Sequence, residues 1–344
     1  MLFSIIIPAY NAENSLQDTL RSICMQTFDD YEIILVNDGS TDGTEKLCKR
    51  FCETNKHARY IKQVNKGVYE ARRTGARKST GEFLLFVDAD DRLRSDSLAL
   101  LADNIAELNP DVICFRYTRH EDYSNDPLLS SPLTPDFYSG NTLIQVKKCL
   151  AQGRLNSIWC KAIKRKCILK SLEIAPIQRI DFAEDLLQMI SIIEETESVL
   201  QIDDILYHYN VQNDKSATHN YREKQLEDLT YVTSILIQKA ASWDNAIEKD
   251  ALRMRSSQYL YLLLINELTS AKDRKKENFL SIVRELFSLG DKTLPPSDAR
   301  RLDSYILYLA AKHKNYALAK LVIHTSEAAK GIIRIILSQA SRKQ

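Results

Sequence analysis

The sequence has no long hydrophobic run. Its longest apolar stretches, residues 259–265 and 332–337, fall far short of the roughly 18 residues that a membrane-spanning helix needs. Glycine and proline are also scarce, at 9 and 8 residues among 344, which excludes collagen-like repeats. Because 44% of the residues are hydrophobic and 27% are charged, the composition also excludes a mainly disordered chain and a polytopic membrane protein.

A paired cysteine framework is missing as well. The seven cysteines are odd in number and irregularly spaced, so the sequence indicates neither a set of disulfides nor a zinc site. We expect reduced thiols that pack as small apolar groups. The first eight residues lack a basic region and a small-residue cleavage site, and therefore favour a buried strand over a signal peptide.

The charge is unevenly distributed along the chain. Residues 1–221 carry 26 Lys and Arg against 32 Asp and Glu, a net charge of −6. Residues 222–344 carry 21 against 14, a net charge of +7. The basic end favours an anionic partner surface, whereas the acidic first part, without a basic and aromatic surface pattern, argues against nucleic-acid binding.

The length and the periodicity predict two domains. A chain of 344 residues exceeds the roughly 250–300 at which one core stops growing. In residues 1–117, short apolar runs alternate with amphipathic segments, which is typical of an α/β domain with a mostly parallel sheet. Residues 120–140 are rich in loop formers, and the chain from 221 onward has helical spacing with a break at 294–296. We predict an α/β domain over 1–220 and an all-α region over 221–344. The strands of the first part are expected at 3–8, 32–36, 58–64, 82–87 and 111–117.

Polar clusters follow several of the predicted strands. They comprise residues 9–11, 37–40, 65–67 and 88–91. Because ligands of parallel α/β sheets bind beyond the carboxyl ends of the strands, these clusters predict a binding site.

Asp88 and Asp90 follow the fourth strand. Alternate residues of an extended segment point the same way, so both carboxylates can face one ligand. Such hard oxygen ligands suit Mg²⁺ or Mn²⁺ bridged to substrate phosphates. The alternative is a surface turn with a helix cap.

Two further segments also suggest ligand binding, but neither indicates one kind of ligand by itself. The Asp38 carboxylate, at the end of the second strand, offers an acceptor to a base or a ribose, as acidic residues do in dinucleotide-binding folds. An Asx turn is the alternative. Residues 65–75 open a helix with Gly67 and several cations, which favours an anion at the helix N-terminus or, alternatively, a solvated basic face.

Together these segments resemble a known family. Residues 4–11 (SIIIPAYN), 36–44 (VNDGSTDGT), 65–75 and 86–91 (FVDADD) have the order and spacing found in family 2 glycosyltransferases with the GT-A fold, like those of bacterial capsule, exopolysaccharide and lipopolysaccharide synthesis. The resemblance covers residues 1 to about 120 closely and extends less closely to 220. It implies inverting transfer of a sugar from a nucleotide-diphosphate donor.

The resemblance also implies roles for individual residues. Asp38 would hold the base or ribose, Arg72 would lie near the base, and Asp88 and Asp90 would carry the metal at the diphosphate. Arg73 departs from the family, which usually has Asn there. The implied donor-binding residues of this part of the chain are Pro8, Ala9, Tyr10, Asp38, Asn65, Gly67, Arg72, Asp88, Ala89 and Asp90.

A second group is implied further along the chain. Asp185 resembles the family's general base, which takes the proton of the acceptor hydroxyl, and Glu184 precedes it on the acceptor side. Without the family resemblance, the sequence favours a role for Asp185 as a helix cap or as an acidic residue of the first helical turn. Trp159 and Lys161 resemble a Trp-Asn-Lys segment near the acceptor, although Cys160 replaces the Asn and a core tryptophan is the alternative.

Residues 207–219, which begin in a strand-like segment expected at 198–209, resemble the family's flexible lid. Lys215 and Ser216 would close on the diphosphate and exclude water. His219 would be a third metal ligand, as a late histidine is in some members, or else a plain surface histidine.

The resulting prediction is a metal-dependent, inverting glycosyltransferase that uses Mn²⁺ or Mg²⁺. UDP-sugar is the default donor, and the acceptor is a glycan or polyprenol-linked hydroxyl in bacterial surface polysaccharide synthesis. We expect a cytoplasmic protein, peripheral on the inner membrane face through the basic segment 328–343. The alternative is that this segment packs on the helical region or on a second subunit. The alternatives are a non-catalytic subunit of an assembly complex and a sugar-phosphate nucleotidyltransferase, whose Gly-rich loop is absent at residues 9–13.

Overall fold

The computed structural model describes residues 1–129, 131–172, 176, 178–211, 221–296 and 302–325. The chain divides into two compact units. The first comprises Met1–Leu150 and Arg154–Asn213, and the second comprises Ala151–Gly153 and Asp214–Gln344. The domain boundary predicted at residue 220 falls within 212–220, outside the described residues.

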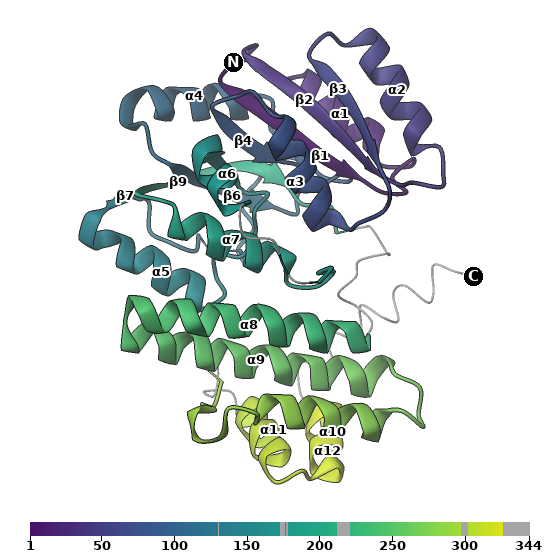
Figure 1. Cartoon of the computed structure of the whole chain (residues 1–344), viewed down its shortest axis with the longest axis vertical. Helices are drawn as coiled ribbons and strands as arrows, with labels where there is room; N and C mark the ends of the chain where they lie inside the picture. Colours follow the sequence, from purple (N-terminus) through teal and green to yellow (C-terminus); the bar gives the residue numbers. More distant parts are fainter. Residues whose placement is uncertain (130, 173–175, 177, 212–220, 297–301, 326–344) are drawn as a thin grey trace. The chain divides into compact units, whose positions relative to one another are not determined.

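One mixed sheet forms the centre of the first unit (Figure 1). Among the described residues it has nine strands in the order β3-β2-β1-β4-β8-β6-β9-β5, with β7 paired to β9. The strands are β1 Phe3–Ala9, β2 Tyr31–Asp38, β3 Ala58–Gln63, β4 Phe83–Phe86, β5 Arg92–Leu93, β6 Val112–Thr118, β7 Asp136–Ser139, β8 Lys161–Lys164 and β9 Ser198–His208.

The first four strands run parallel because a crossover helix joins each of them to the next. All residues of β1 and β2 are buried, as expected for near-continuous apolar strands of a covered parallel sheet. The helix α3 packs on β1 and β2, where Gly75 lies against Ile6 and Val36. The helices of this unit are α1 Leu16–Cys24, α2 Thr44–Thr54, α3 Val68–Lys78, α4 Ser97–Leu108, α5 Leu143–Ala151, α6 Arg165–Ser171 and α7 Glu184–Glu194, with the 3₁₀ turn η1 Gly140–Thr142.

The strand register aligns the carboxyl ends of the parallel strands. Pro8 pairs with Val36, and Ile6 pairs with Phe86. The polar segments that follow β1, β2 and β4 therefore meet at one edge of the sheet. The predicted α/β class of this part of the chain is confirmed.

The sequence pattern missed the short strands. β7 lies inside the segment 120–140, which we predicted as loop, and β8 pairs antiparallel with both β4 and β6. Each of these strands has four residues, too few for a period of two to stand out. Their positions are set by pairing with strands distant in the sequence.

The second unit is helical over its described residues, as predicted. The buried side chain of Arg255 donates to the carbonyls of Glu285 and Leu286, at 2.5 and 2.8 Å, and so satisfies the end of one helix from another. The helices are α8 Glu223–Trp243, α9 Asn245–Thr269, α10 Lys275–Leu286, α11 Leu302–Lys312 and α12 Tyr316–Thr325, with the 3₁₀ turn η2 Gly290–Lys292.

Two expectations from composition can be compared with the structure. All seven cysteines are free thiols, and five of them are buried. In the part of the chain that the structure describes, no helix combines the length and apolar character required to cross a membrane.

Candidate active site

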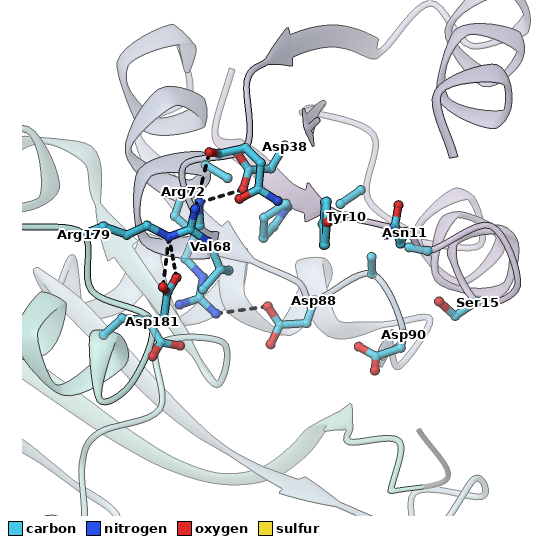
Figure 2. A pocket seen from close by; sticks show the side chains of 18 residues that line it. Tyr10, Asn11, Ser15, Asp38, Val68, Arg72, Asp88, Asp90, Arg179 and Asp181 are labelled. Atoms are coloured by element: carbon cyan, nitrogen blue, oxygen red, sulfur yellow. Dashed lines mark hydrogen bonds and ion pairs between the residues drawn. The ribbon is translucent and has the colours of Figure 1, made fainter. Parts of the chain in front are cut away.

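A cavity of about 400 Å³ opens at the carboxyl ends of β1, β2 and β4. All ten donor-binding residues predicted from the first 90 positions line it, together with Glu184 and seven residues that were not among the predicted site residues, including Arg179 and Asp181. Figure 2 shows these side chains converging from separate strand ends and from the loop before α7. The complete lining is Pro8, Ala9, Tyr10, Asn11, Ala12, Ser15, Asp38, Asn65, Gly67, Val68, Ala71, Arg72, Asp88, Ala89, Asp90, Arg179, Asp181 and Glu184.

Asp38 builds one wall of the cavity. Its carboxylate is only 3% exposed and accepts hydrogen bonds from the backbone N–H groups of Lys66 and Gly67, at 2.9 and 2.8 Å. It also accepts from the Gln63 side chain at 2.7 Å. Because these bonds use three of about four lone-pair sites, Asp38 first of all fixes the loop 65–67.

Gly67 is required at its position for two reasons. Its φ of +87° lies in the left-handed region that side chains rarely adopt. A Cβ there would also lie 2.9 Å from Oδ1 of Asp181. Because Gly67 has no side chain, the segment 179–181 can approach the loop 65–67 closely.

Arg72 joins two carboxylates from different elements. Its side chain is 3% exposed, and it pairs with Asp88 at 3.1 Å and, from its other terminal nitrogen, with Asp185. Burial alone would lower the pKa of Arg72, but the charges of Asp185 and Asp88 outweigh it and raise the pKa. Arg72 lines the cavity, and its guanidinium is engaged by these carboxylates. Its predicted place near a nucleotide base stays a prediction.

The residues after β4 divide into two kinds. Asp88 and Asp90 line the cavity, and burial raises the pKa of Asp88. Asp91 is buried and points away. It accepts from the Tyr207 hydroxyl at 2.7 Å and from the Asn210 N–H at 2.8 Å. Burial, followed by the charge of Asp88, raises the pKa of Asp91 to about 8.

The carboxylates fit a divalent cation only together with a ligand. No cluster of three or more His, Cys, Asp or Glu side chains among the described residues forms a ready metal cage. Asp88 and Asp90 nevertheless supply two hard oxygen ligands beside open cavity space. This donor set suits Mg²⁺ or Mn²⁺, which commonly bind one or two carboxylates and complete their shell with phosphate oxygens and water.

Glu184 and Asp185 begin α7, after Ala183 in the left-handed conformation with φ of 59°. Glu184 lines the cavity, and burial, followed by the charge of Asp185, raises its pKa to about 8. Asp185 does not line the cavity. It is held by Arg72 and, at 3.4 Å, by the backbone N–H of Ile158. The side chain of Asp185 remains 21% exposed.

The predicted acceptor residues Trp159 and Lys161 do not line this cavity. Trp159 stacks on Tyr209 with ring centroids 5.4 Å apart and packs on Tyr207 at 4.8 Å. Lys161 is 1% exposed and donates to the Ser157 carbonyl, so in this arrangement it braces the turn before β8.

Three predicted residues, Lys215, Ser216 and His219, lie outside the described residues. Conversely, the sequence analysis missed Arg179 and Asp181. The only signal for them was their position a few residues before the Glu184–Asp185 pair.

Comparison with known proteins agrees with this arrangement. The family model described as "Glycosyl transferase family 2" matches residues 4–168. Glycosyltransferase GlyA of Streptococcus pneumoniae is 40% identical over 114 residues, which are 33% of this chain and 16% of GlyA. The uncharacterized glycosyltransferase EpsJ of Bacillus subtilis is 29% identical over 224 residues, 63% of each chain. The matches thus span less than two thirds of either relative.

A solved structure shares the fold. The crystal structure of S. aureus TarS 1-349 in complex with UDP-GlcNAc has a TM-score of 0.69 at 20% identity, covering 94% of this chain and 91% of that one. Residues 4–168, slightly less than half of the chain, therefore match the model of family 2 glycosyltransferases, and the predicted motif residues of this segment gather around one cavity.

Proposed function

We propose that the chain is a metal-dependent, inverting glycosyltransferase that moves a sugar from a UDP-sugar to a hydroxyl group of a glycan or lipid-linked acceptor. One observation carries this proposal. Arg72 ties Asp88, at the strand end that faces the cavity, to Asp185 at the start of α7. A candidate metal ligand and a candidate general base are thereby held by a single side chain.

The residues would share the reaction as follows. Asp88 and Asp90 would hold Mg²⁺ or Mn²⁺, which acts as a Lewis acid on the leaving diphosphate. Asp185 would take the proton of the acceptor hydroxyl as its oxygen forms a bond to the anomeric carbon. The bond from that carbon to the diphosphate breaks, and its electron pair leaves with UDP. Attack from the opposite face turns an α-linked donor into a β-linked product.

The comparisons support the donor and the setting of this proposal. TarS has been solved with UDP-GlcNAc, which supports a uridine nucleotide here. GlyA and EpsJ are bacterial glycosyltransferases, which supports a role in a bacterial glycan. The basic tail proposed to contact an anionic membrane lies within 326–344, outside the described residues.

The test combines nucleotide binding with turnover. UDP should raise the melting temperature of the protein with Mn²⁺ present, and Asp90→Ala should lose this shift. Asp185→Asn should lower release of UDP from its sugar donor by about 10²- to 10⁴-fold while UDP affinity stays near that of the wild type. The matched control, Asp103→Asn, changes an exposed residue of α4 outside the cavity.

Near-normal turnover of Asp185→Asn would contradict its role as the base. An α-linked product from an α-linked donor, detected by NMR, would contradict the inverting mechanism.

A further inference from the structure

The corner of the cavity around Gly67 is built by a segment that the sequence motifs do not contain. The Nε of Arg179 donates to both carboxylate oxygens of Asp181, at 2.8 and 2.9 Å. A terminal nitrogen of Arg179 lies 3.4 Å from the carbonyl of Asn65. Figure 2 shows Arg179 and Asp181 facing each other at the side of the cavity remote from Asp90. Asp38 fixes the other half of this corner through the loop 65–67.

This corner is where a nucleoside base fits, an inference that rests on the proposed function. The diphosphate must lie at Asp88 and Asp90 if these residues hold its metal. The sugar must then point toward Asp185, which is tied to Asp88 through Arg72. The remaining part of the cavity, between Asp38 and the Arg179–Asp181 pair, is left for the base.

The polar groups of the corner have fixed hydrogen-bonding character. An arginine side chain can only donate, and an ionised carboxylate can only accept. Arg179 therefore offers donors beside the carboxylates of Asp38 and Asp181. Uracil presents the matching edge, a carbonyl next to a ring N–H. Cytosine presents an amino group next to an unprotonated ring nitrogen, and both of these would face groups of their own kind.

We propose that Arg179 is a specificity-determining residue that selects a base with an adjacent carbonyl and N–H, as in uridine nucleotides, by donating to the carbonyl. Asp181 orients Arg179 by its two-oxygen contact, and the absence of a side chain at Gly67 makes room for the pair. Arg72 has no share in this selection because Asp88 and Asp185 engage its guanidinium.

UDP and CDP are the appropriate probes because they have nearly the same size and differ only in the carbonyl or amino group at position 4 of the base and in the hydrogen on the adjacent ring nitrogen. Their dissociation constants are measured by titration calorimetry with Mn²⁺ for the wild type, Arg179→Ala, Arg179→Lys and the control Arg50→Ala. Arg50 is an exposed residue of α2 outside the cavity. We expect the wild type to bind UDP more tightly than CDP. In Arg179→Ala the ratio of the two affinities should fall about tenfold, chiefly through weaker UDP binding. Arg179→Lys keeps a cationic donor and should restore part of this ratio.

Several outcomes would overturn the proposal. One is an unchanged ratio of UDP to CDP affinity in Arg179→Ala, and another is an equal change in Arg50→Ala. If the variant weakens a UDP-sugar but leaves free UDP unaffected, Arg179 contacts the sugar rather than the base. The melting temperature without ligand shows whether Arg179→Ala is folded, and Arg179→Gln replaces it if not.

Failure of the proposed function gives a different result. In that case the wild type itself would bind neither nucleotide, or Asp90→Ala would bind UDP as well as the wild type. If the wild type binds UDP in preference to CDP and Arg179→Ala loses that preference, the result supports the role of Arg179 specifically.

Discussion

Individual carboxylates of the site differ in what their surroundings do to them. Asp38 is buried among donors, Asp88 faces a guanidinium, and Glu184 lies beside a second carboxylate. The family resemblance assigned these residues different roles, but the sequence did not show their surroundings. Their separate environments come from Arg72 and the loop 65–67, which bring together groups up to 113 positions apart.

Glu184 gives a pH prediction. Burial raises its pKa to about 8 in the folded protein, against an ordinary value near 4.5. The stability it contributes is fully present below about pH 4.5 and is lost as the pH rises through 8, because the unfolded chain ionises first. Glu184→Gln should therefore flatten the fall in the free energy of unfolding between pH 5 and 9, measured by urea titration with EDTA.

The control for this measurement is Glu194→Gln, at the other end of α7. This variant should keep the slope of the wild type. A Glu184→Gln protein whose stability falls with pH as steeply as that of the wild type would show that Glu184 titrates as an exposed carboxyl group.

At the scale of elements, the helix α3 packs on the sheet and also carries a charged residue of the candidate site. The helix carries Arg72 on its buried face, and Gly75 on the same helix allows close approach to β1. The position of Arg72 relative to Asp88, which follows β4 beside β1, therefore depends on how closely α3 packs. A displacement of this helix would move the ion pair as well.

Gly75→Ala tests this packing. The added Cβ would overlap Cγ2 of Ile6 and lie 3.3 Å from a methyl group of Val36. We expect a loss of about 1–3 kcal/mol in the free energy of unfolding from overpacking, against which the helix propensity of alanine returns about 1 kcal/mol. Urea unfolding of the variant measures the difference.

A double-mutant cycle makes the cause specific. If Ile6 is the obstacle, Gly75→Ala combined with Ile6→Ala should lose less stability than the sum of the two single changes. In the control Gly43→Ala, the close contact of the new Cβ is with the carboxylate of Glu13 rather than with the packed core, so a cost there would come from the hydrogen bond between that carboxylate and the Gly43 N–H. Strict additivity in the cycle would contradict the packing argument.

The elements also show what periodicity can and cannot predict. β1 and β2 were identifiable because most of their seven and eight residues form apolar, β-branched runs, and all of them are buried in the structure. β8 and β7 were not, since their four-residue segments are strands only through pairing with β4, β6 and β9. In the site, Asp88 and Asp90 could be found from a motif. Arg179 and Asp181 could not, because they reach the cavity by packing on the bare backbone of Gly67.

At the scale of the whole molecule, the net charge of the part of the chain that contains the cavity has the same sign as the proposed donor. Residues 1–221 carry a net charge of −6, yet the proposed donor is an anion. Long-range attraction from this part of the chain therefore cannot bring the donor to the cavity. Local cations have to compensate, namely Arg72, Arg179 and the metal that Asp88 and Asp90 would hold. Weak nucleotide binding without the metal follows from this balance.

The two units have separate roles in this proposal, since every residue lining the cavity belongs to the first. Leu263 is a buried residue of α9 in the second unit, and Leu263→Ala should lower the stability of that unit by about 2–5 kcal/mol. Hydrogen exchange should show faster exchange in 223–325, while titration calorimetry should show UDP affinity unchanged. Leu321→Ala, at a residue 62% exposed on α12, is the control and should alter neither quantity. A folded Leu263→Ala protein with weakened UDP binding would contradict the separate roles of the two units.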